Sequence, residues 1–97
     1  MKVYFKNSKG KERIIGRASC KKGKAREKST KIINDFLQSR NYKAPYWRIT
    51  QHENNVHIDV GSWSEFFRIE LEEGEKYEFG NFERTNWKEV DDRIFLF

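Results

Sequence analysis

Only one stretch of the chain has its apolar residues at helical spacing, and this limits the fold more than any other feature. Between residues 24 and 40, small and apolar side chains recur every three or four positions and so fall on one arc of a helix. The arc consists of Ala25, Ser29, Ile32, Ile33, Phe36 and Leu37. The large apolar residues start only at Ile32, so an alternative is that Ser29 or Thr30 is the N-cap and the residues before it form a loop. Asn41 can take the left-handed conformation that ends a helix. A single amphipathic helix must bury this arc against another element, and the remaining candidates are strands.

The other segments alternate between apolar and polar residues, which is typical of half-buried strands. This pattern predicts strands at 1–7, 12–19, 46–51, 56–60 and 65–72, a short strand at 76–79 and a C-terminal strand at 93–97. Residues 84–92 fit no single pattern. We therefore expect an α+β fold with the order β-β-α-β-β-β and an uncertain tail. One helix packs on a twisted antiparallel sheet, and residues 1–97 form a single small domain.

Two small residues indicate where the helix lies on the sheet. Strict alternation would place Ile14, Gly16 and Ala18 on one face of the second strand. Gly16 and Ala18 leave room for a larger element above them, and the helix is the natural candidate. Although only 36% of the 97 residues are hydrophobic, three Trp, four Tyr and eight Phe supply enough apolar area for one core.

The charges are divided unevenly along the chain. Residues 1–48 contain fifteen Lys and Arg against three Asp and Glu, whereas residues 49–97 contain five against twelve. If folding keeps the halves apart, one pole of the molecule attracts polyanions and the other repels them. The alternative is that the two halves neutralise each other as ion pairs across the sheet.

The start of the helix has the densest positive charge. Residues 17–31 contain seven Lys and Arg and one acid, Glu27, although a helix N-terminus normally favours carboxylates. An anion bound at the helix N-terminus would relieve this unfavourable arrangement. The alternative is a solvated lysine loop without a ligand.

We expect a small non-enzymatic protein that binds a polyanion, DNA or RNA, through the basic first hairpin and the helix entrance. The candidate nucleic-acid-binding residues are Lys9, Lys11, Arg13, Arg17, Lys21, Lys22, Lys24, Arg26, Lys28 and Lys31. Their charge suits phosphate contacts, but no base-reading motif accompanies them.

A second hypothesis is a small interaction protein of the kind made by phages or mobile elements. It would bind and inhibit a host protein, such as a nucleic-acid enzyme or a defence complex, through an acidic face. That face would contain Glu70, Glu72, Glu73, Glu75 and Glu78. An unpaired C-terminal strand would also allow a homodimer through edge pairing.

No stretch of the sequence carries a diagnostic catalytic or cofactor motif. His52 and His57 with Glu53 or Asp59 have the side chains of a metal or acid–base site, but we interpret them as surface residues. We therefore expect no enzyme, catalytic residue, metal or cofactor, and a small nuclease or metal-dependent activity is the alternative.

The cysteine content and the lack of long apolar segments indicate in which cellular compartment the protein is found. Nearby cations would lower the thiol pKa of Cys20 if it were accessible, but a lone cysteine is more often a small core residue. One cysteine, no apolar leader after Met1 and no run of about 20 apolar residues predict a cytoplasmic protein without a membrane segment.

Overall fold

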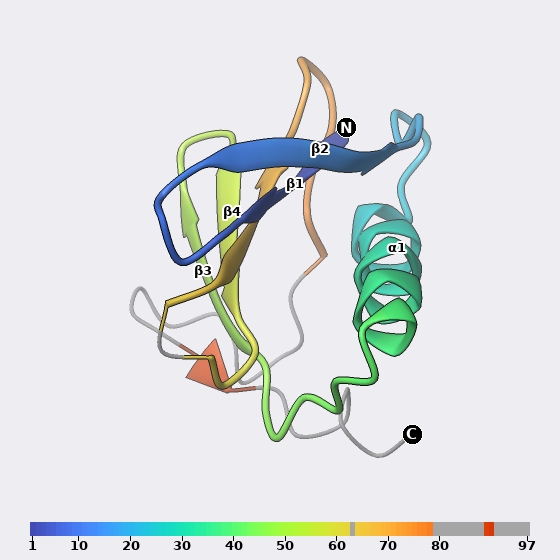
Figure 1. Cartoon of the computed structure of the whole chain (residues 1–97). Helices are drawn as coiled ribbons and strands as arrows, with labels where there is room; N and C mark the ends of the chain where they lie inside the picture. Colours follow the sequence, from blue (N-terminus) through green and yellow to red (C-terminus); the bar gives the residue numbers. More distant parts are fainter. Residues whose placement is uncertain (63, 79–88, 91–97) are drawn as a thin grey trace.

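The computed structural model describes residues 1–62, 64–78 and 89–90 and confirms the α+β fold (Figure 1). One helix packs on an antiparallel sheet with the strand order β2-β1-β5-β4-β3-β6. The elements in chain order are β1 (Lys2–Lys6), β2 (Glu12–Arg17), α1 (Ala25–Ser39), β3 (Arg48–His52), β4 (Asn55–Asp59), β5 (Phe66–Glu70) and β6 (Glu89–Val90). Strand β2 forms one edge of the sheet.

Two of the predicted strands near the end of the chain have different outcomes. Residues 76–78 form no strand, so the prediction of a short strand at 76–79 is wrong for the part that the structure describes. The predicted strand at 93–97 lies outside the described residues. The two-residue strand β6 falls within the stretch that fitted no pattern, and it pairs with β3 through Arg48 and Ile49.

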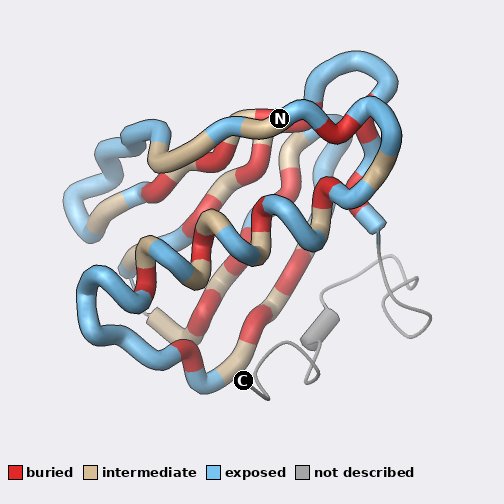
Figure 2. Tube along the Cα trace, turned by 90° about the vertical axis from the view of Figure 1, so that its right-hand side faces the viewer, coloured by how far each residue is buried: buried red, intermediate tan, exposed pale blue. Residues whose placement is uncertain are grey.

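The core lies between α1 and one face of the sheet (Figure 2). The inward residues of β1, β4 and β5 alternate with outward ones, as period-2 patterning requires. Phe5 of β1, Phe36 of α1 and Phe67 of β5 form an aromatic cluster with ring centroids 4.7–5.8 Å apart. Such rings contribute more buried area than any aliphatic side chain, which explains how a polar chain forms a core.

A β-bulge changes the predicted faces of the second strand. Val3 pairs with Gly16 and Tyr4 pairs with Ile14, so Ile15 is an extra residue between them. The prediction that Ile14 shares a face with Gly16 is therefore wrong. Ile14 lies on the face of the sheet that α1 does not cover, which we call the open face, and 38% of its surface is exposed. Gly16 does lie under the helix, because an added Cβ would be 2.8 Å from Ile32 Cγ2.

The helix ends as expected at its C-terminus. Asn41 has a left-handed backbone with φ of 57°, and the N–H groups of Asn41 and Tyr42 donate to carbonyls of the last turn. No helix within the described part of the chain has the length and apolar character needed to span a membrane.

Candidate functional site

The helix N-terminus is already occupied by a carboxylate of the same chain. Lys24 is the N-cap residue with a left-handed backbone and makes no side-chain cap. Glu78 supplies the cap instead, because its carboxylate accepts hydrogen bonds from the backbone N–H groups of Lys24 at 2.6 Å and Arg26 at 2.9 Å. The predicted external anion at this position is therefore not needed to offset the helix dipole.

Burial alone would raise the pKa of Glu78, but the hydrogen bonds from the backbone of Arg26 and Lys24 outweigh burial and lower the pKa. The carboxylate is therefore the stable form at neutral pH. It sits at the helix entrance as a fixed negative charge.

A second carboxylate, Glu75, joins the loop before the helix to the start of the chain. Its oxygens contact the Met1 ammonium at 2.9 Å and accept hydrogen bonds from the backbone N–H groups of Cys20 at 3.0 Å and Glu72 at 2.8 Å. Burial opposes the charge of Glu75, but these hydrogen bonds outweigh it and lower its pKa to about 2. The buried charge is thus paired on several sides and is a structural element of the loop.

Cys20 is part of the same cluster. Its side chain is 2% exposed, and Sγ donates to Glu75 at 3.2 Å. Burial and the neighbouring carboxylate raise the thiol pKa to about 11. The nearby lysines therefore do not activate this thiol, and Cys20 is a core residue.

The candidate nucleic-acid-binding residues follow one edge of the sheet. Lys9 and Lys11 lie at the tip of the β1–β2 hairpin, and edge strand β2 leads from there to the loop at 18–24 (Figure 1). The lysines of that loop and of the first helical turn continue the series. The predicted residues therefore follow one edge of the sheet to the helix start. Within β2, Arg13 is opposite the inward Phe5 and Arg17 is opposite the outward Lys2, so these two side chains leave opposite faces of the strand.

Four members of the predicted set are engaged with other groups. The guanidinium of Arg13 lies 5.4 Å from the ring centroid of Phe36. Lys31 pairs with Asp35 one helical turn away at 3.0 Å. Arg26 is half-buried, with its guanidinium 6.0 Å from the ring centroid of Tyr77, and it donates to the Glu78 carbonyl. The Lys28 ammonium donates to the Ser19 carbonyl at 2.6 Å, which fastens the helix to the loop but leaves its charge unbalanced.

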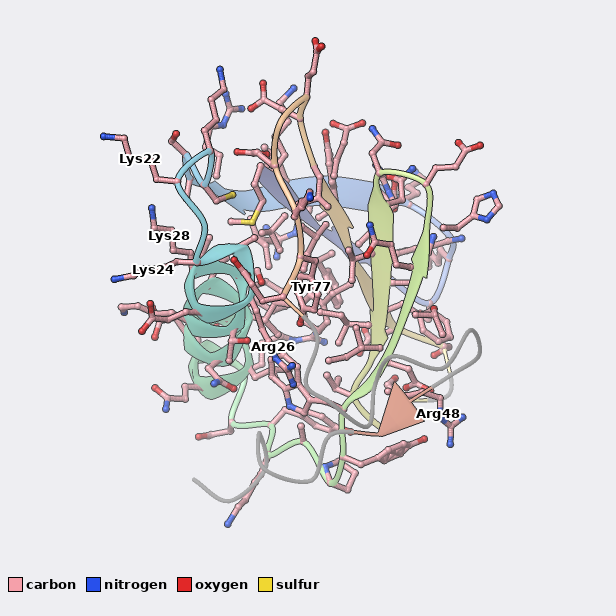
Figure 3. The ribbon with its side chains drawn as sticks, turned by 180° about the vertical axis from the view of Figure 1, so that it is seen from behind. Lys22, Lys24, Arg26, Lys28, Arg48 and Tyr77 are labelled. Carbon is pink, nitrogen blue, oxygen red and sulfur yellow. The ribbon has the colours of Figure 1, made fainter. Side chains whose placement is uncertain are left out.

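Eight of the ten predicted cations, Arg13 and Lys28 among them, keep their charge without a carboxylate partner in the part of the chain that the structure describes. We call the following eight residues the basic edge; among the residues that the structure describes, none of them has an ion pair within 4 Å: Lys9, Lys11, Arg13, Arg17, Lys21, Lys22, Lys24 and Lys28. The side chains of Lys22, Lys24 and Lys28 point away from the same side of the molecule, whereas Arg26 lies on the inner side of the helix near Tyr77 (Figure 3). All eight residues are exposed.

The acidic residues of the second hypothesis do not form one open face. Glu75 is only 8% exposed, so its assignment to a protein-binding surface is wrong. Glu72 contacts the Met1 ammonium at 3.1 Å, and Glu78 caps the helix. Glu70 lies 3.8 Å from Arg68, so within the described ranges Glu73 is the one predicted acid whose side chain makes no hydrogen bond or ion pair.

The open face of the sheet carries a polar cluster centred on Arg68, which the sequence pattern did not identify. Its guanidinium pairs with both carboxylate oxygens of Glu12 at 3.0 and 3.1 Å, donates to Asn55, and lies 4.3 Å from the ring centroid of Tyr4. Arg68 lowers the pKa of Glu12 chiefly through the hydrogen bonds. Only the strand register could have identified this cluster, because it places Arg68 of β5 opposite Tyr4 of the neighbouring strand β1.

The histidines lie on the same open face but form no metal centre that the structure describes. His57 is opposite Thr50, and His52 is opposite Asn55. Burial, followed by the charge of Arg68, lowers the pKa of His57. Within the described residues, no group of three or more His, Cys, Asp and Glu side chains is placed to bind a metal ion.

Comparisons with known proteins provide no relative from which a function could be transferred. No protein-family model matches the chain, and neither a curated protein nor a solved structure matches it.

Proposed function

We propose that the protein binds the phosphate backbone of a nucleic acid through the basic edge. The observation that supports this proposal is that the carboxylates nearest the basic edge contact the chain terminus and backbone N–H groups and not its lysines and arginines. Glu72 and Glu75 contact the Met1 ammonium, and Glu78 contacts backbone N–H groups at the helix start. These acids lie close to the basic edge and yet leave its side chains unneutralised within the described residues.

The dimensions of the basic edge suit several phosphates. Strand β2 has six residues, and six extended residues span about 20 Å. Phosphates along one strand of a B-form duplex are about 3.4 Å apart along the axis, so β2 alone is as long as about six of them. The hairpin tip and the loop extend the basic edge beyond both ends of the strand.

Charged side chains on an edge strand also have a structural use, because they prevent pairing with another sheet edge. This explanation suits Arg13 and Arg17, which lie on β2. It does not apply to Lys21 and Lys22, because they follow the strand in a turn closed by the hydrogen bond from Gly23 N–H to the Cys20 carbonyl. The loop lysines therefore provide the sharper test of binding.

Substitution of the loop lysines should weaken binding to nucleic acid without affecting the fold. We expect Lys21→Gln with Lys22→Gln to reduce affinity for a labelled oligonucleotide, single- or double-stranded, by about 10-fold at low salt, since each lost phosphate contact also removes counterion release. Fluorescence anisotropy measures the affinity.

The control is the double variant Lys31→Gln with Lys43→Gln, which removes the same charge from exposed positions outside the basic edge. It should bind almost as well as the parent protein. Equal losses in both double variants would mean that only net charge matters and would contradict a localised interface.

The rival function is that of a small interaction protein of the phage or mobile-element type that binds and inhibits a host protein, such as a nucleic-acid enzyme or a defence complex. It has less support because the acidic face is smaller than the sequence suggests. A pull-down from lysate with and without nuclease separates the two. Capture of nucleic-acid-associated proteins that is lost on nuclease treatment supports the proposal. Capture of one protein that survives nuclease treatment, with no direct oligonucleotide binding, contradicts it.

A further inference from the structure

Two cations face each other where β1 meets β2, beside the basic edge. Lys2 and Arg17 are direct partners in the antiparallel register, so their side chains leave the same face of the sheet. It is the open face, because the neighbouring pair, Val3 and Gly16, lies on the face that α1 covers. Like charges directly opposite each other destabilise a pair of strands. The fold therefore maintains an unfavourable contact at this position.

The neighbouring acid does not relieve the pair. Glu70 is opposite Lys2 on the β5 side, but its carboxylate accepts a hydrogen bond from Tyr4 Oη at 3.4 Å and lies 3.8 Å from Arg68. Neither Lys2 nor Arg17 has an ion pair within 4 Å among the residues that the structure describes.

The two cations line a hollow of about 380 Å³ at the surface. Its other lining residues are Met1, Ala18, Ser19 and Glu72. The carboxylate of Glu72 is 3.1 Å from the Met1 ammonium, which it shares with Glu75. Lys2 and Arg17 therefore outnumber the one acid that lines the hollow. Since one liquid water occupies about 30 Å³, the hollow has room for a phosphate group with part of its hydration shell.

We propose that this hollow binds a phosphate group that bridges Lys2 and Arg17, and that in the complex it is a phosphodiester of the nucleic-acid backbone. A guanidinium presents two parallel N–H groups to phosphate oxygens, and the ammonium adds a point charge on the other side. The bound anion converts the repulsion between the two cations into attraction. This inference rests on the proposed function, and it extends the interface from the basic edge onto the open face through a residue, Lys2, that the sequence did not single out.

The test uses sodium pyrophosphate as the probe and thermal unfolding as the readout, against sodium chloride at the same ionic strength. At ten times its dissociation constant, pyrophosphate should raise the melting temperature of the parent protein by about 7 °C. The double variant Lys2→Gln with Arg17→Gln should lose this rise, and the Lys31→Gln, Lys43→Gln control should keep it. Without ligand, Lys2→Gln should not lower the melting temperature, because it removes the repulsion.

The outcomes separate this inference from the proposed function. No rise in the parent protein, or an undiminished rise in the Lys2→Gln, Arg17→Gln variant, overturns the phosphate site. If that variant also binds an oligonucleotide as well as the parent does, the proposed function stands and this site is outside the interface. A rise that depends on Lys2 and Arg17 in a parent protein that binds no oligonucleotide supports a site for free phosphate compounds and overturns the assignment to a phosphodiester.

Discussion

At the scale of single residues, Glu75 is the side chain on which the start of the chain and the loop before the helix both depend. It contacts the Met1 ammonium and the backbone of Cys20, which are 74 and 55 positions away. A buried ion pair is costly to break, since the remaining charge loses its partner. Replacement of this carboxylate should therefore affect the loop as a whole.

The pH dependence of stability should report on Glu75. Its folded-state pKa of about 2 is below the ordinary value of 4.5 for a glutamate, so the unfolded chain binds the proton more tightly. The resulting stabilisation is present above pH 4.5 and is lost as the pH falls toward 2. Urea unfolding between pH 7 and pH 2 should show a steeper loss in the parent protein than in Glu75→Gln, which is less stable at pH 7. Parallel pH profiles would contradict this role.

At the scale of elements, the helix depends on a residue outside it. Glu78 is 52 positions after Arg26 in the sequence, yet it accepts the hydrogen bond from the Arg26 N–H group that a local Ser or Asp usually accepts. The loop before α1 can therefore keep its lysines, because the cap comes from the other end of the described chain. The lysines near the helix start therefore do not leave the helix dipole uncompensated, because the Glu78 carboxylate supplies the negative charge there.

Removal of the charge on Glu78 should have opposite effects on stability and binding. Glu78→Gln should cost about 1 kcal/mol of unfolding free energy through the weaker cap. It should also tighten oligonucleotide binding about twofold, since it removes a negative charge beside the basic edge. Glu73→Gln is the control, because it removes an exposed carboxylate of the same segment that makes no hydrogen bond or ion pair with the described residues. Urea unfolding and anisotropy measure the two effects, and equal stabilities of the two variants would contradict the capping role.

At the scale of the whole molecule, the local patterns predicted the fold because each depends on neighbours in the sequence. The range with helical spacing, 24–40, agrees within one residue with α1, which runs from Ala25 to Ser39, whereas the alternative start at Ser29 or Thr30 is wrong. The bulge at Ile15 was missed, because alternation gives no sign of an extra residue until its partner strand is known. The roles of Glu75 and Glu78 were missed for a similar reason, since long-range hydrogen bonds leave no local pattern.

The candidate site was predictable in composition but not in arrangement. Eight of the ten predicted cations form the basic edge, whereas Arg26 turns toward Tyr77 and Lys31 pairs with Asp35. Helical spacing alone could have indicated the second of these pairs. The pairing of Lys2 with Arg17 depends on the strand register, which the sequence does not specify.

The central claim is that folding leaves the early cations on one exposed edge and does not neutralise them with the later acids. The measurement that tests it most directly is the salt dependence of oligonucleotide affinity for the parent protein. If at least four of the eight cations of the basic edge contact phosphates of a duplex, the logarithm of the affinity should fall with the logarithm of the salt concentration at a slope of about −3.6 or steeper. A slope near zero, or no binding at low salt, would contradict the claim.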